Sequence, residues 1–227
     1  MFYFDLSLIL RVFISPNSAF LQVRDNEEKY FSQSIALLII SSVLGGLAVL
    51  PFVMMPLDDA YFEIPESENI DETFPLEDSA VGLSIISSLL SGFVSAILYY
   101  FIGKKLDGNT NWKKVFSVIF HIHAIVIPIT IIMAMLLFLM WGSFTSIDSS
   151  ILLDPNNDDE EVFSLLGSFI GYVLLLAIVG ISFAIWGLIV TIKAIKVVHG
   201  FGTGKAFGLI ILVGTITSLV SIPFSFG

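Results

Sequence analysis

The sequence predicts an all-α membrane protein: a polytopic bundle of five transmembrane helices, preceded by short interfacial amphipathic helices. Hydrophobic residues make up 56% of the 227 positions and charged residues only 13%, about half the usual charged share. Five apolar stretches lack Asp, Glu, Lys and Arg, and each has the roughly 20 residues that a spanning helix needs. The basic residues all fall on one side of these stretches. This composition excludes a soluble enzyme and a nucleic-acid binder with a basic face.

Residues 1–33 are expected to form cytosolic helices on the membrane surface. The segment Met1–Ile14 is too short to span a bilayer and carries Asp5 and Arg11 within its apolar run, which favours a helix lying in the membrane plane. Ser15 and Pro16 are typical of a helix start, with Ser15 as the cap and Pro16 in the first turn. A second short interfacial helix is therefore expected over Asn17–Lys29.

Residues 34–227 are expected to form the five-helix transmembrane domain. The helices are predicted at 34–56, 81–103, 115–141, 162–190 and 207–226, with boundary errors of several residues. The loops 57–80 and 142–161 connect the first span to the second and the third to the fourth, and both are rich in Asp and Glu.

The distribution of charge predicts how the chain is threaded. Of the ten Lys and Arg residues, three precede the first span, four lie between the second and third, and three lie between the fourth and fifth. The two outer loops contain none of them and hold 15 of the 20 acidic residues. Because basic residues near span ends stay in the cytosol, we expect a cytoplasmic N-terminus and an extracytoplasmic C-terminus. The membrane would be the cell membrane of a prokaryote or the ER or Golgi membrane of a eukaryote.

Small residues form two candidate packing faces. Ser84, Ser88 and Gly92 recur every four residues in the second span, and Gly167 and Gly171 have the same spacing in the fourth. Small residues let helices approach closely in lipid, where hydrophobic attraction between helices is weak. Close packing is the favoured interpretation, and a serine-lined path for a solute is the alternative.

The third span carries the candidate functional residues His121, His123 and Pro128. Ionisable residues at membrane depth are functional candidates by default. Positions two apart point to nearly opposite faces of a helix, whereas two-histidine chelation on a helix needs a spacing of four. A neutral histidine bonded to a neighbouring Ser or Thr is therefore favoured over a proton or metal role. Pro128 removes a backbone hydrogen bond and predicts a kink, which is more often only shape than a hinge.

No motif for catalysis is found. The sequence has no Cys, no Ser-His-Asp arrangement, no intramembrane carboxylate pair and no zinc-protease motif. The stretch 200–206 is similar to a phosphate-binding loop, but His199 stands where that motif needs Gly and Ala206 where it needs Ser or Thr. His199 is expected in a cytoplasmic loop without an obvious partner. We therefore expect a non-enzyme with no catalytic residue, cofactor or metal site.

Three segments resemble the Ypt-interacting-protein (YIP) family of five-span membrane proteins, which share the Yip domain. Ser15–Phe20 places a Pro and then a Phe on a short helix before the first span. Leu106–Val118 is similar to the family's glycine-containing turn, which leads into a third span with a Pro further along. Ile185–Ala206 is similar to its Trp-containing fourth span, followed by a Lys-Ala turn. The chain looks like a compact, prokaryote-like member, and the resemblance implies five spans and a cytosolic N-terminus.

The resemblance also sets the functional expectation. Eukaryotic members of the family bind Rab-type small GTPases and one another, and act in ER–Golgi vesicle traffic. Only residues 1–33 precede the first span here, and Phe120-His121-Ile122-His123 stands where those members tend to carry Gly-Tyr-Ser, so small-GTPase binding is not expected. We expect a non-enzymatic scaffold or adaptor in membrane organisation or trafficking, with a small transporter or channel component for a solute or cation as the alternative. Its expected partners are the lipid bilayer and other membrane proteins or a second copy, and no nucleic acid.

Overall fold

A computed structural model describes residues 4–48, 50, 76–145 and 159–221 of the chain. Within these ranges the regular structure is entirely helical. The helices are α1 (Leu6–Ile14), α2 (Pro16–Asp25), α3 (Glu27–Leu47), α5 (Leu76–Lys105), α6 (Trp112–Thr145), α8 (Asp159–His199) and α9 (Thr203–Ser221).

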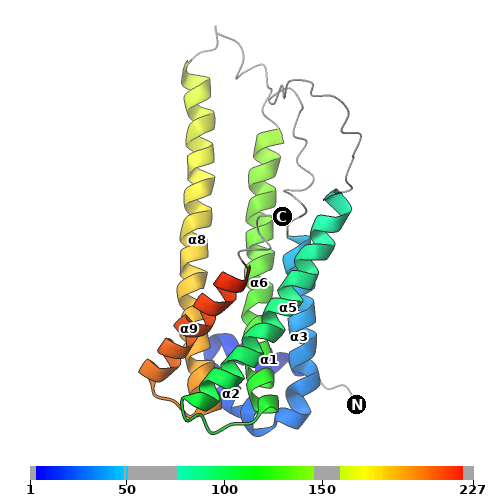
Figure 1. The fold of residues 1–227 in the computed structure, drawn as a ribbon. Coiled ribbons are helices and arrows are strands. Elements are labelled where there is room, and N and C mark those ends of the chain that lie inside the picture. Colours follow the sequence, from blue (N-terminus) through cyan, green and yellow to red (C-terminus); the bar gives the residue numbers. More distant parts are fainter. Residues whose placement is uncertain (1–3, 49, 51–75, 146–158, 222–227) are drawn as a thin grey trace.

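The long helices run side by side, and the short ones gather at one end (Figure 1). Helix α3 packs against α5 and α6, which also contact each other, and α6 contacts α8. Helix α9 crosses obliquely against α5 and α8. Helices α1 and α2 contact α6, and α2 also contacts α8, at the end of the bundle where the described Lys and Arg residues lie. We call this end the lysine end and the opposite end the outer end.

Four helices are long and apolar enough to cross a membrane. They are Glu27–Leu47, Val81–Lys105, Trp112–Met140 and Gly167–His199. The apolar part of α9, Thr203–Leu219, is shorter. The fifth predicted span therefore stays a prediction.

The helix boundaries differ from the expected ones near the N-terminus. The helix expected over Asn17–Lys29 ends at Asp25, because Asn26 breaks it and α3 begins at Glu27. Asn is a favoured residue before a helix, and Glu27 and Glu28 favour the positive end of the helix dipole. Ser15 does precede α2 with Pro16 in its first turn, but the Ser15 hydroxyl accepts a bond from Ser18 Oγ and caps no backbone amide.

The other long helices extend past the apolar stretches that predicted them. Helix α5 begins at Leu76, α6 continues to Thr145 and α8 begins at Asp159. Parts of the loops expected at 57–80 and 142–161 are therefore helical. The rest of these loops, 57–75 and 146–158, and the end of the first predicted span after residue 50 lie outside the described residues.

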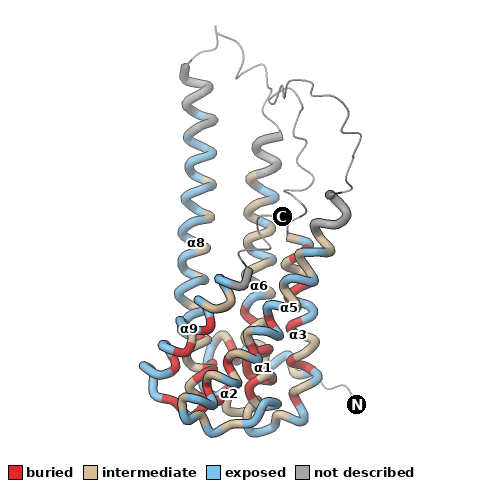
Figure 2. The backbone as a smooth tube through the Cα atoms, in the orientation of Figure 1, coloured by how far each residue is buried: buried red, intermediate tan, exposed pale blue. Residues whose placement is uncertain are grey.

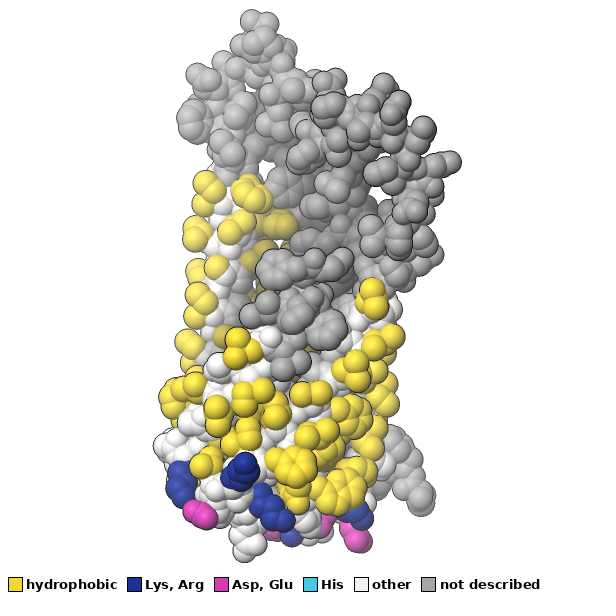
Figure 3. Space-filling view, in the orientation of Figure 1, with side chains coloured by type: hydrophobic (Ala, Val, Ile, Leu, Met, Phe, Trp, Pro, Cys, Tyr) yellow, Lys and Arg dark blue, Asp and Glu magenta, His cyan; other side chains and the backbone are white. Residues whose placement is uncertain are grey.

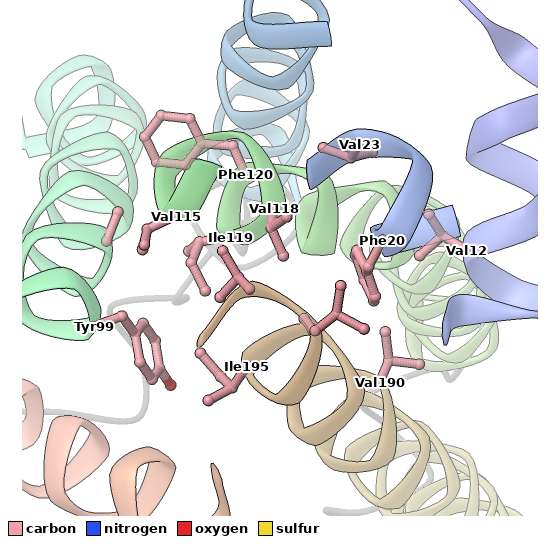
Figure 4. Packing of buried hydrophobic residues seen from close by; sticks show 14 of the residues in the cluster. Val12, Phe20, Val23, Tyr99, Val115, Val118, Ile119, Phe120, Val190 and Ile195 are labelled. Atoms are coloured by element: carbon pink, nitrogen blue, oxygen red, sulfur yellow. The ribbon is translucent and has the colours of Figure 1, made fainter. Parts of the chain in front are cut away.

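The buried residues concentrate at the lysine end (Figure 2). Leu8 and Val12 of α1 and Phe20 of α2 belong to one cluster with residues of α6 and α8, among them Phe120 and Ile195 (Figure 4). Figure 3 shows a band of hydrophobic side chains above the basic ones, as expected where a membrane surrounds the helices.

Candidate functional site

The two histidines of α6 both bond to serines of α3. Ser34 Oγ lies 2.8 Å from His121 Nδ1, and Ser41 Oγ lies 2.8 Å from His123 Nδ1. His121 and Ser34 are fully buried. The expectation that each histidine bonds to a neighbouring serine is confirmed. We call these four residues the histidine–serine seam.

The neighbouring carbonyl groups decide where the ring protons lie. His121 Nδ1 is also 2.8 Å from the Ser117 carbonyl oxygen, which can only accept, so Nδ1 carries the proton and donates it. The Ser34 hydroxyl donates to the Tyr30 carbonyl. His121 Nε2 is therefore a bare acceptor, and it is buried without a partner among the described residues.

The second histidine follows the same logic. Ser41 Oγ donates to the Leu38 carbonyl at 2.9 Å, so the proton shared with His123 comes from its Nδ1. His123 Nε2 faces α5, at 3.5 Å from the point where a Cβ on Gly92 would lie. Both histidines thus carry an acceptor nitrogen at Nε2.

The geometry gives the two rings no common ligand position. They lie about 160° apart around α6 and bond to Ser34 and Ser41, which are about two turns apart along α3. The described residues contain no group of three His, Cys, Asp or Glu able to hold a metal ion. The seam can therefore fix α3 against α6, and its two open nitrogens can each accept one hydrogen bond.

A polar network beside the seam was not anticipated from the sequence. Asp5 donates its backbone amide to Gln33 Oε1 at 3.0 Å, and Gln33 Nε2 donates to the Asp5 carbonyl at 3.2 Å. The Tyr30 hydroxyl accepts from Gln22 Nε2 at 2.7 Å and lies 3.4 Å from Asp5 Oδ2. Arg11 Nη1 donates to Gln22 Oε1 at 3.0 Å. The sequence shows these polar residues only as a group that precedes the first apolar stretch, and it does not indicate how they pair.

Asp5 is the titratable centre of this network. The Ser7 hydroxyl donates to its carboxylate, and the Leu8 amide, Arg11 and the Tyr30 hydroxyl add to the effect, so the pKa of Asp5 is held below its ordinary value of 3.8 despite partial burial. The charged carboxylate also caps α1, because Oδ1 accepts from the Leu8 amide at 3.0 Å.

The two predicted packing faces have different surroundings. Ser88 Oγ donates to Ser42 Oγ of α3 at 3.1 Å, and a Cβ on Gly92 would lie 2.5 Å from Leu38 Cδ1. Ser84 lies one turn before Ser88 in α5 and is half-buried. Gly167 and Gly171 of α8 are exposed, with no described atom within 4 Å of an added Cβ. Close packing at Gly167 and Gly171 would need a helix of another chain. It stays a prediction.

Two further sites from the sequence are placed by the structure. Pro128 lies inside α6, which continues as a helix to Thr145. His199 is the last residue of α8, and its ring is 2% exposed. The expectation of a loop position is wrong, because His199 ends α8 and its ring lies against Gly103 and Gly108. Because glycine has no side chain, Gly103 and Gly108 leave room for the His199 ring. In the sequence they are only two isolated glycines.

The long apolar helices and the seam between them indicate the class of protein. The chain is a multi-pass integral membrane protein whose regular structure is helical throughout the described residues, with a polar seam between two of its candidate spans. The family model described as the Yip1 domain matches residues 10–223, which is nearly the whole chain. The protein therefore belongs to the Yip1-domain family, as its motifs predict. No curated protein and no solved structure gives a match.

Proposed function

We propose that this protein is a non-enzymatic membrane scaffold or adaptor of the YIP family, acting in membrane organisation or trafficking. The carrying observation is the two-sided character of α1. Its Leu8 and Val12 are fully buried in the bundle core, whereas Leu6, Leu10 and Ile14 are 57–83% exposed. A short helix fixed by one face and apolar on the other is suited to lie on the membrane surface and meet another membrane protein.

The attachment of this N-terminal part supports the proposal. Asp5 and Gln33 join α1 to α3 through two hydrogen bonds. Arg24 Nη1 of α2 donates to the Val197 carbonyl of α8 at 3.0 Å. A partner bound to α1 would therefore be held in a fixed position relative to the spanning helices, as scaffolding requires.

The direct test is crosslinking in the membrane, followed by purification in mild detergent and mass spectrometry. We expect a stoichiometric protein partner with the unmodified chain and its loss with Leu6→Ser/Leu10→Ser/Ile14→Ser. The matched control replaces three exposed isoleucines of α8, Ile178, Ile181 and Ile185, with Ser and should retain the partner. Recovery of every partner after deletion of residues 1–29 would contradict the proposal.

The proposed orientation places the N-terminus in the cytosol and the C-terminus outside. It is supported by the position of all ten basic residues at one end of the bundle. Because the chain has no Cys, a single Glu68→Cys change gives a clean label site. Labelling by an impermeant maleimide in intact cells is expected, and labelling only after lysis would reverse the orientation.

A small transporter or channel component is the second candidate, and one observation favours it. His121 Nε2 is a buried acceptor without a partner among the described residues, and such groups can contact a permeating solute. Cation flux into liposomes that is abolished by His121→Phe or His123→Phe would support this function. Absence of flux with the unmodified chain would exclude a cation-channel function.

A further inference from the structure

Four lysines from three helices form one corner of the lysine end. Lys104 and Lys105 end α5, Lys196 lies in the last turn of α8, and Lys205 lies in the first turn of α9. Lys196 Nζ donates to Thr203 Oγ1 at 2.8 Å, and Lys205 Nζ donates to the Leu106 carbonyl at 3.4 Å. We call these four residues the lysine corner. The acid Asp107 lies beside it, with Oδ2 at 3.8 Å from Lys205 Nζ.

A buried aromatic stack fixes the position of this corner. The His199 ring fills the space left by Gly103 and Gly108 and stacks on Phe201, with ring centroids 5.0 Å apart and planes inclined by 17°. Lys205 Nζ lies 5.8 Å from the centroid of the Phe201 ring. The turn between α8 and α9 is thereby held against the turn that follows α5, and the lysines of the three helices stay together.

Some of the other basic residues of this end lie near acids. Arg24 and Asp25 end α2, and Glu27, Glu28 and Lys29 begin α3. Arg24 Nε lies 2.8 Å from Asp25 Oδ1, and Lys114 adds to the lowering of the Asp25 pKa. The tendency of basic residues to remain in the cytosol explains why lysines are at this end. That rule concerns Lys and Arg, and it makes no statement about where Asp and Glu lie. It does not explain why the four corner lysines outnumber the acid paired with them, Asp107.

The surface above the corner is apolar. Ile97 and Phe101 of α5 are 41% and 61% exposed, and with Lys105 they follow each other every four residues along one face of the helix. Figure 3 shows hydrophobic side chains directly above basic ones on this side of the molecule. A ligand that fits this surface must be apolar where it lies along α5 and anionic where it meets the lysines.

We propose that the lysine corner binds the phosphate of an anionic phospholipid, whose acyl chains lie along the exposed face of α5. Lysines next to a spanning helix attract anionic headgroups in the same leaflet, and their long stems reach from apolar surface to the headgroup level. The leaflet is the one at the lysine end, which the charge distribution makes the cytosolic one. This inference needs no partner protein and is independent of the proposed scaffold function.

The test uses the full chain in phosphatidylcholine bilayers that contain a trace of spin-labelled phosphatidylglycerol or spin-labelled phosphatidylcholine. Electron paramagnetic resonance measures the motionally restricted fraction of each lipid, and their ratio gives the selectivity. Replacing all four corner lysines with Gln should lower this selectivity at least about fivefold, since each lysine near the surface contributes substantially. The matched control, Arg11→Gln/Lys29→Gln/Lys113→Gln/Lys114→Gln, removes the same charge away from the corner and should change the selectivity by less than about twofold.

Two further variants separate site geometry from charge and from misfolding. Replacing the four lysines with Arg keeps the charge and should retain the selectivity. Gly108→Leu keeps every lysine but excludes the His199 ring from its position, and should reduce the selectivity of a chain that still elutes as a folded species. An equal loss of lipid selectivity in the corner and control variants would overturn the proposal. It would show that anionic lipid is attracted by the general charge of this surface. Displacement of the labelled lipid by soluble glycerol phosphate would overturn it in favour of a soluble anion.

Discussion

The lysine end and the outer end of this bundle are stabilised in different ways. On α6 the buried residues run from Val115 to Ile125, and the described residues beyond Ile125 are half-buried or exposed. On α8 they begin at Val190, and the described residues before it are likewise half-buried or exposed. Where α1, α2 and α9 join the long helices, protein packs against protein. Towards the outer end lipid takes that place, because lipid tails are as apolar as leucine side chains.

The largest expected effect comes from comparing two leucines of α1. Leu8 is fully buried and Leu10 is 57% exposed. Leu8→Ala should lower the free energy of unfolding by about 3 kcal/mol, because it leaves a cavity in the shared core. Leu10→Ala should change it by less than about 0.5 kcal/mol. Unfolding in mixed micelles, followed by circular dichroism, measures both, and equal effects would show that α1 is not part of the core.

A glycine pair contrasts the two ends directly. Gly92→Ile should destabilise the protein by about 2 kcal/mol, since the new side chain overlaps Leu38 and approaches His123. Gly171→Ile on α8 has open space within the chain and should be neutral or slightly stabilising in the same unfolding assay. A large loss at Gly171 that depends on protein concentration would instead reveal packing against a second chain.

The histidine–serine seam should contribute a smaller amount. Removing the bond between Ser41 and His123 should cost about 0.6 kcal/mol, the usual value for a hydrogen bond between membrane helices. A double-mutant cycle with Ser41→Ala and His123→Phe isolates this coupling. The control is Ser182→Ala, because the Ser182 hydroxyl bonds only within its own helix, to the Ile178 carbonyl. A coupling near zero would mean that the seam does not hold α3 to α6.

The smallest effect is expected from pH. The pKa of Asp5 is lower in the folded protein than its ordinary value of 3.8, so its contribution to stability is complete above that value. This contribution is lost as the pH falls below 3.8 through the folded pKa, when the protonated carboxyl stops capping α1. Hydrogen exchange of the α1 amides should therefore accelerate below about pH 4. Asp5→Asn should remove this acceleration, and its persistence would assign the change to another group.

Much of the architecture could be predicted because lipid imposes simple rules. Apolar stretches located four helices that satisfy the length and composition needed to span, and the positions of Lys and Arg separated the two ends. The helix start at Pro16 and the bonding of His121 and His123 to serines also followed from residue chemistry. The spans, the two ends and the helix start each depend on one segment and its solvent, and the histidine bonds depend on the need of any buried ring nitrogen for a partner.

The remaining features depend on which segments meet in space. Periodicity placed His121 and His123 on opposite faces, but α3 approaches α6 between those faces, so both rings reach it. The pairing of Asp5 with Gln33 joins positions 28 residues apart, and no local pattern specifies that partner. His199 was expected in a loop with no obvious partner, because the space that its ring occupies is made by Gly103 of α5 and Gly108 of the turn after it, far away in the chain. The Asn26 break was visible in principle, since Asn followed by two Glu is a common helix start.

Helix α8 has a consequence for how the chain enters the membrane. It contains 41 residues and is therefore about 60 Å long, roughly twice the thickness of the hydrocarbon core. It begins with Asp159, Glu160 and Glu161 and carries Lys193 and Lys196 near its other end, so its side-chain charges complement its own backbone dipole. A membrane potential that is negative inside draws the lysine end inward and repels the acidic end, by about 2.3 kcal/mol per charge for each 100 mV. An energised bilayer thus favours one direction of insertion for this helix, and membranes without a potential should yield more inverted chains.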